Sequence, residues 1–422
     1  MPGVYSIKEH EPIRTNGRLS ERDIEDLKGF ARSNQYDQQG NYRPVLQFDR
    51  SGGLRAGNYV GIITTKRRNI VEILPKIDFA GKADPDHEET RRIFLNMLRS
   101  SRRLRAAAQF RYSAIRALRR FPMLDVFVRL FLENLGLLVR GGLGRRYRRV
   151  EENLPYLRGR LLFRDQIREN LIDQSRFFVR HDELSVNRPA NRLIQSTLST
   201  LKPVVRNEGN RQLIRNLETS FIEVPPARDL RADWRKHSVD RSMQHYKPVM
   251  RWVGLFLFNQ GLTTWSGSHV NQSLLFPMEE VYEDFVTHSF RRHQDRFTVT
   301  SQGPQRPMAC IGGKSVFQTK PDISLRERNG RVRFILDAKW KRAGARDGDA
   351  RHDLDQRDLY QMYFYGKRHR CKTVALVYPR SRRFPQELTY RFFDGLKLVC
   401  LPFDIARPNH GVSEALRLLK CS

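Results

Sequence analysis

The sequence of 422 residues contains only 4 cysteines, and none of them is paired at a motif-like spacing. Cys310, Cys371, Cys400 and Cys421 form no Cys-x-x-Cys pair and no spacing typical of a zinc site. This pattern excludes the disulfide framework of a small secreted protein. We interpret the four residues as free thiols and expect a cytoplasmic protein.

Signals for export or membrane insertion are also lacking. The N-terminus, MPGVYSIKEHEPIR, has no apolar segment typical of a signal peptide. The most apolar window, from Leu124 to Val139, is too short to span a bilayer and is interrupted by Asp125, Arg129 and Glu133. Its apolar residues recur at helical spacing, so the window predicts a core helix. We therefore expect no membrane partner.

Acidic residues are few relative to basic ones. The chain has 46 Asp and Glu against 77 Lys and Arg, which gives a formal net charge of +31. Such an excess indicates a polyanionic partner, and nucleic acid is favoured because no membrane anchor is present. With 39% hydrophobic residues the chain can bury sizeable cores, and its length suits two or three domains.

Several catalytic motifs are missing. The sequence has no Gly-x-Ser-x-Gly nucleophile motif, and its 11 histidines form no ligand cluster. Gly312-Gly313-Lys314-Ser315 resembles the end of a phosphate-binding loop, but Met308 stands where the leading glycine is required. We therefore expect no hydrolysis of nucleoside triphosphate by this chain.

The order of patterns predicts a multidomain chain of the α+β or α/β class. Residues 1–82 are mainly β, with strands from Tyr59 and from Asn69; residues 90–265 are mainly helical and rich in arginine. Residues 270–422 predict a mixed sheet, with a helix beginning at Met278 and a buried central strand over Thr373–Pro379. Boundaries are expected within the polar segments 81–89 and 261–274.

The segment from Lys320 to Lys341 predicts a β-hairpin around Asn329-Gly330, which suits a two-residue type I′ turn. Asp322 and Asp337 each lie seven residues from that turn, so they would face each other across the hairpin. Lys339 shares the face of Asp337. Facing like charges destabilise a hairpin, but a divalent cation between them reverses this effect.

Pro321-Asp322 followed by Asp337-Ala338-Lys339 resembles the core of the PD-(D/E)xK nucleases. The resemblance implies a restriction-endonuclease-like fold that holds Mg²⁺ through Asp322 and Asp337 and cleaves phosphodiesters. Lys339 would position or deprotonate the attacking water, or stabilise charge on the phosphate; the sequence does not choose among these roles.

Flanking helices supply further candidates for this site. Glu283, on the helix from Met278, is our candidate for a third metal-binding carboxylate, with Glu279 as the alternative. The competing interpretation is that the acidic residues of this helix form a solvated face without a catalytic function. Gln361 and Tyr365 lie four residues apart and share a helix face. The spacing resembles the Gln-x-x-x-Tyr motif of RecB-like nucleases, which makes Gln361 a candidate catalytic residue.

The whole chain resembles the McrC family, the nuclease subunits of McrBC-type modification-dependent restriction systems. The matching pieces, in family order, are Val71–Ile77, Leu157–Leu161 with Asn170, Asn191–Ile194, Phe276–Val286, the Asp322/Asp337/Lys339 core and Asp358–Gln361. The resemblance implies an N-terminal region that docks onto an McrB-like AAA+ GTPase ring and stimulates it, so that GTP is used by the partner. Exposed-looking arginines there are Arg50, Arg55, Arg67 and Arg68.

Double-stranded, modified DNA is the polyanion that this resemblance implies. Phosphate contacts are expected from basic side chains of the helical region and from two residues near the nuclease core; the candidates are Arg102, Arg103, Arg119, Arg120, Lys341 and Tyr365. Two other functions stay open: a non-catalytic DNA-binding activator of the GTPase, and a nuclease directed at RNA.

Overall fold

The computed structural model describes residues 3–15, 19–33, 42, 44–77, 86–102, 121–237, 241–258, 273–341, 343 and 354–421. The chain divides into two compact units, one formed by Met1–Met123 with Gly261–Ser422 and the other by Leu124–Gln260. The first unit contains both the N-terminal β region and the predicted nuclease region. Most residues of the expected boundaries lie outside the described residues, and the three-domain division stays a prediction.

The N-terminal part of the first unit is β-rich, as the sequence predicts. Its four-stranded sheet has the order β1 (Val4–Lys8), β6 (Ile70–Leu74), β5 (Tyr59–Thr64) and β10 (Ser273–Pro277). A second, small sheet has the order β2 (Pro12–Ile13), β4 (Leu54–Ala56) and β3 (Leu46–Phe48), and the helices are α1 (Glu21–Ser33) and α2 (His87–Leu98). The strands expected from Tyr59 and Asn69 are confirmed as β5 and β6, which pair antiparallel.

Strand β10 connects the two parts of this unit and was not predicted from the sequence. It pairs antiparallel with β5 and continues directly into α11 (Met278–His293). The pairing requires glycine at position 61, because a Cβ there would lie 1.9 Å from the carbonyl oxygen of Leu274. The N-terminal sheet is therefore continuous with the helix that carries Glu283.

The predicted nuclease region contains a six-stranded mixed sheet. Its order is β11 (Thr298–Ser301), β14 (Ile323–Arg326), β15 (Val332–Ala338), β16 (Thr373–Pro379), β18 (Lys397–Phe403) and β17 (Leu388–Arg391). Strands β15, β16 and β18 are parallel, and the outer pairings are antiparallel. The apolar run Thr373–Pro379 is confirmed as a buried central strand, because it lies between β15 and β18.

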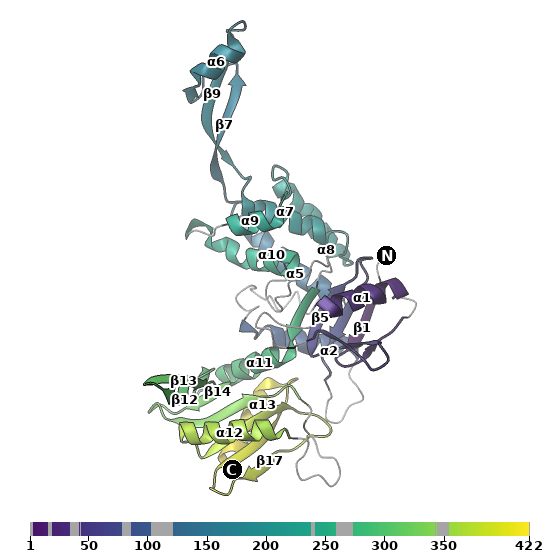
Figure 1. Cartoon of the computed structure of the whole chain (residues 1–422), viewed down its shortest axis with the longest axis vertical. Helices are drawn as coiled ribbons and strands as arrows, with labels where there is room; N and C mark the ends of the chain where they lie inside the picture. The colour runs from purple at the N-terminus through teal and green to yellow at the C-terminus, as the bar shows by residue number, and fades with distance from the viewer. Residues whose placement is uncertain are drawn as a thin grey trace. The chain divides into compact units, whose positions relative to one another are not determined.

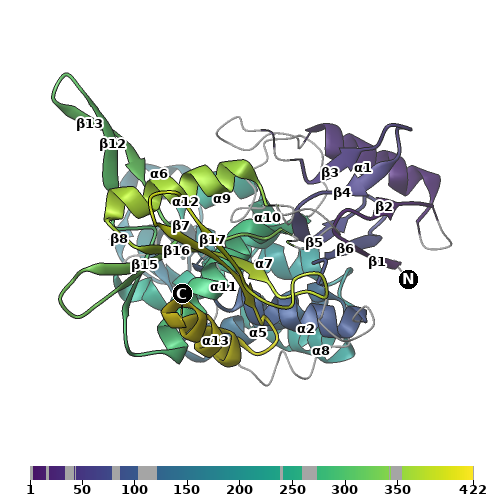
Figure 2. The same cartoon turned by 90° about the horizontal axis from the view of Figure 1, so that it is seen from below.

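Helices cover both faces of the six-stranded sheet. α12 (Gln356–His369) packs Met362 and Tyr365 on one face, whereas α11 and α13 (Pro408–Cys421) pack on the other, where Phe285 and Phe290 contact Phe403. Figure 2 shows α12 and α13 on opposite sides of the strands. The helices expected from Met278 and around Gln361 and Tyr365 are thus confirmed.

The hairpin between β14 and β15 differs from the prediction in its turn. Asn329 does not adopt a positive φ, whereas Gly330 does (+82°), so the two-residue type I′ turn is wrong. Glu327 and Arg331 instead close a three-residue loop, and the register shifts again at a bulge between Leu325 and Arg326. The two deviations cancel, and Ile323 pairs with Leu336 in the predicted register.

A second hairpin, β12 (Arg306–Ile311) with β13 (Lys314–Thr319), carries the segment that resembles a phosphate-binding loop. Gly312 and Gly313 both have positive φ, and Ile311 pairs with Lys314 across them. These glycines therefore form a hairpin turn rather than a loop between a strand and a helix, which agrees with the expectation from the sequence.

The second unit is mainly helical, as predicted. Its helices are α5 (Met123–Arg140), α7 (Pro189–Leu201), α8 (Glu208–Glu218), α9 (Leu230–Lys236) and α10 (Lys247–Phe258), with 3₁₀ turns η1 (Thr219–Phe221) and η2 (Arg241–Tyr246). The expected core helix is confirmed as α5, whose apolar residues are mostly buried. Within the described residues, no helix has both the length and the apolar character needed to cross a bilayer.

A β-arm projects from the helices of the second unit, and we define it as residues 146–185 (Figure 1). It consists of β7 (Arg146–Leu154), β8 (Arg160–Leu161), α6 (Phe163–Asn170) and β9 (Phe177–Ser185), with β9 between β7 and β8. The long strands were not predicted, because β7 is mostly exposed and lacks alternating apolar residues. Cross-strand charge pairs stabilise it instead, such as Arg180 with Glu151 at 2.7 Å.

Candidate active site

Asp322 and Asp337 lie where the sheet brings β14 and β15 together. Asp322 immediately precedes β14, and its Oδ2 accepts the backbone N–H of Ala338 at 2.9 Å. Asp337 is almost fully buried in β15, opposite Leu376 of the parallel strand β16. The pair thus faces across the hairpin, as the predicted register requires.

Lys339 is held at this site by three polar contacts. Its Nζ lies 2.7 Å from Asp337 Oδ2, 3.3 Å from Asp358 Oδ1 and 3.2 Å from Gln361 Oε1, to which it donates. Gln361 in turn donates through Nε2 to the Tyr365 hydroxyl at 3.1 Å. Burial alone would lower the pKa of Lys339, but the neighbouring Asp337 carboxylate raises it above the ordinary value, so the ammonium stays charged.

Asp358 is a site residue that the sequence analysis did not assign. Its carboxylate contacts Lys339 through one oxygen and Lys341 through the other, at 3.3 and 3.2 Å. Lys341 also lies 3.4 Å from Asp355. The signal was available, because Asp358 stands three residues before Gln361 and therefore shares its helix face.

Glu283 reaches the site from α11 but has partners of its own. Its Oε1 accepts from Arg102 Nη2 at 3.1 Å and from Gln302 Nε2 at 3.2 Å. Arg102 also donates through its backbone N–H and Nε to the neighbouring Asp284. The alternative residue, Glu279, lines a cavity near the N-terminal sheet with Glu9 instead.

The three candidate carboxyls destabilise each other's charged forms. Burial raises the pKa of Asp322 well above its ordinary value, and the charges of Asp337 and Glu283 raise it further. Burial likewise raises the pKa of Asp337, although the charge of Lys339 opposes this shift. Burial also raises the pKa of Glu283, and its contacts with Gln302 and Arg102 oppose that shift. A divalent cation at this place would offset the repulsion.

The donor set fits a hard cation such as Mg²⁺ in part. In the described ranges, no three Asp, Glu, His or Cys side chains stand close enough together to hold a metal ion as placed. Mg²⁺ retains several waters and binds one or two protein carboxylates, which Asp322 and Asp337 supply. Glu283 would have to share its carboxylate with Arg102 to become a third ligand.

The predicted nucleic-acid-binding residues have different environments. Arg103, Arg119 and Arg120 lie outside the described residues. Lys341 is half-exposed beside the site. Tyr365 is buried, and its hydroxyl accepts a hydrogen bond from Gln361. The guanidinium of Arg102 is bound to two carboxylates of α11. Phosphate contacts of Arg102 and of the other residues stay predictions.

A family model matches most of the chain. The model is described as "McrBC 5-methylcytosine restriction system component" and matches residues 54–379. The chain belongs to this family. The match extends from β4 to the end of β16 and thus includes Glu283, Asp322, Asp337, Lys339 and Gln361.

Solved structures from this restriction system share the fold of the McrBC-family chain. One is a chain in the refined half-complex of a tetradecameric assembly of Thermococcus gammatolerans McrB AAA+ hexamers with bound McrC, with a TM-score of 0.71 and 18% identity over 99% of this chain and 100% of that one. Another is a chain in the McrBC complex of the same organism, with a TM-score of 0.52 and 18% identity over 70% and 89%. No curated protein matches the chain.

Proposed function

We propose that the chain is the Mg²⁺-dependent endonuclease subunit of an McrBC-like restriction complex and that its substrate is DNA. The observation that supports this most is the contact between Asp337 and Lys339, beside Asp322, on one face of the nuclease sheet. An acidic pair and a charged amine at the end of a central strand suit phosphodiester hydrolysis.

The bound cation would supply Lewis-acid activation of the phosphate and of a water. Asp322 and Asp337 would hold it, since their charges repel each other without it. Lys339 stays protonated beside Asp337 and therefore suits electrostatic stabilisation of the phosphate better than deprotonation of water. Gln361 accepts a hydrogen bond from the Nζ of Lys339 and so fixes its position. The Asp358 carboxylate forms ion pairs with both Lys339 and Lys341.

A non-catalytic activator is the second candidate function, and the same geometry argues against it. A fold kept only for DNA binding has no need of a buried and a partly buried carboxyl that repel each other. Specificity for DNA over RNA follows from the family's association with methylcytosine restriction rather than from charge. RNA cleavage therefore remains an outcome of the test.

We further propose that the chain binds an McrB-like AAA+ GTPase ring and stimulates its GTP hydrolysis. The N-terminal arginines Arg50, Arg55, Arg67 and Arg68 are all exposed, which suits docking by that region.

The β-arm offers a second docking surface. Phe163 and Ile167 on α6 and Leu171 directly after it recur every four residues and are 73%, 62% and 68% exposed, and Ile172 beside them is 98% exposed. Exposed apolar clusters of this kind indicate a protein interface.

Incubation of methylated plasmid with the chain, its GTPase partner, GTP and Mg²⁺ tests the nuclease function. The wild-type chain should cleave the plasmid, and Asp337→Ala should abolish cleavage while still stimulating GTP hydrolysis by the partner. Equal cleavage by the two chains would overturn the catalytic assignment, and cleavage of RNA alone would move the substrate to RNA.

A further inference from the structure

Trp340, which directly follows Lys339, connects the nuclease region to the N-terminal sheet. Its indole Nε1–H donates to both carboxylate oxygens of Glu9, at 3.3 Å to Oε1 and 3.1 Å to Oε2, across 331 positions in the sequence. Glu9 follows the last residue of β1. The contact therefore joins the end of an N-terminal strand to the residue next to the candidate catalytic lysine.

Glu9 itself is fixed on the N-terminal side. Its backbone N–H donates to the Leu74 carbonyl at 2.9 Å, and its Oε2 accepts the backbone N–H of Lys76 at 2.9 Å. The residue is 1% exposed, and burial raises the pKa of its carboxyl to about 7. A buried carboxyl is costly for stability, so its presence calls for a function that an apolar side chain would not perform.

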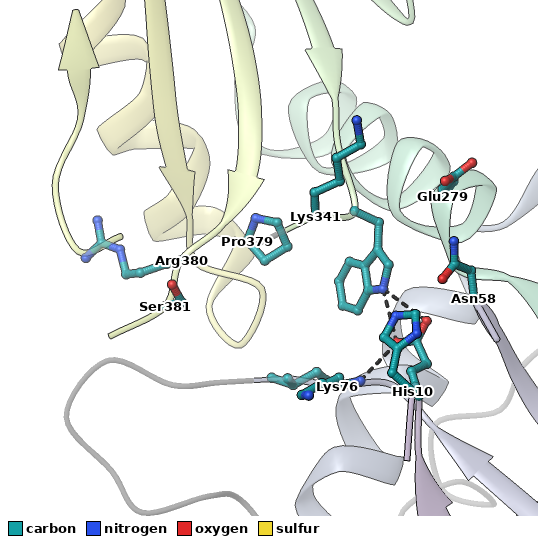
Figure 3. Close-up of a pocket in the computed structure, with 11 residues that line it drawn as sticks. His10, Asn58, Lys76, Glu279, Lys341, Pro379, Arg380 and Ser381 are labelled. Carbon is teal, nitrogen blue, oxygen red and sulfur yellow. Dashed lines mark hydrogen bonds between the residues drawn. The ribbon is translucent and has the colours of Figure 1, made fainter. Parts of the chain in front are cut away.

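Packing alone does not hold the Trp340 indole. A cavity of about 360 Å³ lies beside it, lined also by Glu9, Asn58, Lys76 and Pro379 (Figure 3). The close-up shows Asn58 and Lys76 on the N-terminal side and Pro379 on the side of the nuclease sheet. A ring contact with Tyr282 at 5.4 Å supports the indole as well. The hydrogen bond to Glu9 is thus the directional contact that sets the orientation of the indole.

We propose that Glu9 is a positioning residue for the nuclease site, which holds through Trp340 the segment that carries Lys339. The proposal rests on the proposed nuclease function. The backbone N–H of Lys339 donates to the Val377 carbonyl at 2.9 Å, and this is where the segment leaves the sheet. Beyond that bond, Trp340 anchors the segment to the N-terminal sheet, and Lys341 anchors it to α12.

Misplacement of this segment would act on the chemical step. The Nζ of Lys339 must stay near Asp337 at 2.7 Å and Gln361 at 3.2 Å, and a displacement of about 1 Å in such a site reduces the rate by up to about a hundredfold. The surfaces proposed for the partner, the exposed N-terminal arginines and α6, include neither Glu9 nor Trp340, and most of the expected phosphate contacts are arginines outside this segment. The rate of cleavage should therefore fall without a parallel loss of binding.

Single-turnover cleavage of methylated plasmid by the full complex, with GTP and Mg²⁺, tests the proposal in Glu9→Ala, Glu9→Gln and Trp340→Phe. Glu9→Ala and Trp340→Phe should slow cleavage at least about tenfold, with DNA affinity and GTPase stimulation near those of wild type. Glu9→Gln should restore most of the rate, because its amide oxygen still accepts the indole N–H. Glu11→Ala is the matched control, because Glu11 accepts a backbone N–H of the same segment, from Lys8 at 2.8 Å.

The indole N–H resonance of Trp340, assigned through Trp340→Phe, gives a readout that does not depend on activity. It should shift in Glu9→Ala and stay close to its wild-type position in Glu9→Gln. Wild-type rates in Glu9→Ala and Trp340→Phe would overturn the proposal, as would a parallel loss of DNA affinity and GTPase stimulation. If the wild-type chain itself does not cleave, the nuclease function fails, whereas the resonance still reports the contact.

Discussion

Asp322 Oδ2 accepts the backbone N–H of Ala338 at 2.9 Å, and this bond holds Asp322 against the strand that carries Asp337. The hydrogen bond fixes one carboxylate while the other is paired with Lys339. Two acids of raised pKa are thereby kept together at a cost that a bound divalent cation would offset. The arrangement therefore has the character of a binding site rather than of a structural contact.

The buried carboxyl of Glu9 should make stability depend on pH. Its pKa of about 7 in the folded chain exceeds the ordinary value of 4.5, so the folded state binds the proton more tightly. The free energy of unfolding should therefore fall as pH rises from 4.5 to 7, by roughly 3 kcal/mol in total. Urea unfolding should show Glu9→Gln gaining stability relative to wild type by about that amount between pH 4 and pH 8. A difference that stays constant with pH would contradict this prediction.

Arg102 should stabilise α11 through two carboxylates. Arg102→Ala would leave Asp284, whose side chain is 7% exposed, without its guanidinium partner. Because Arg102 itself is 44% exposed, we expect a loss of about 1–2 kcal/mol rather than the 3–5 kcal/mol of a fully buried pair. Chemical denaturation measures this loss. Arg32→Ala, which removes an exposed pair with Glu25, is the control and should change stability by less than about 0.5 kcal/mol.

Gly61 should be essential for the strand that leads into α11. A methyl group at this position would collide with the Leu274 carbonyl, and the φ of +144° adds strain. Gly61→Ala should therefore cost about 3 kcal/mol or more in unfolding free energy. Gly29→Ala is the matched control, since nothing lies within 4 Å of its Cβ position on α1, and it should stabilise the chain by about 0.5–1 kcal/mol. Similar effects of the two changes would contradict the pairing of β10 with β5.

The apolar face of α6 should bind the partner GTPase. Replacement of Phe163 and Ile167 by serine should leave the melting temperature unchanged, because both side chains are already exposed. Affinity for the GTPase should fall by at least about 100-fold, since each of the two side chains contributes about 1.5–3 kcal/mol when buried. Ile222→Ser, an equally exposed apolar residue outside the β-arm, is the control. Undiminished affinity and GTPase stimulation in the double variant would exclude this surface.

The facing of Asp322 and Asp337 could be predicted from the sequence, although the turn on which the prediction was based is wrong. The facing of Asp322 and Asp337 was inferred from a type I′ turn at Asn329-Gly330 that does not exist, and a bulge restored the register. Turn type depends on backbone angles that Asn-Gly favours but does not enforce. Positive φ at both central residues occurs at Gly312-Gly313 instead.

Contacts between distant segments could not be predicted. The hydrogen bond of Trp340 to Glu9 and the pairing of β10 with β5 join residues that are far apart in the sequence, and no local pattern encodes either. The β-arm was missed for another reason. Its strands are joined by charge pairs, and β7 is mostly exposed, so it lacks the alternation by which strands are recognised.

Binding of Mn²⁺ to the full chain, followed by electron paramagnetic resonance, tests the central claim most directly. Carboxylate sites that suit Mg²⁺ also accept Mn²⁺. The wild-type chain should bind Mn²⁺, and Asp322→Asn and Asp337→Asn should each weaken binding by at least about tenfold. Glu327→Gln, at the far end of the same hairpin, should bind like wild type. Unchanged Mn²⁺ affinity in both asparagine variants would contradict the assignment of a metal-dependent nuclease site to this pair.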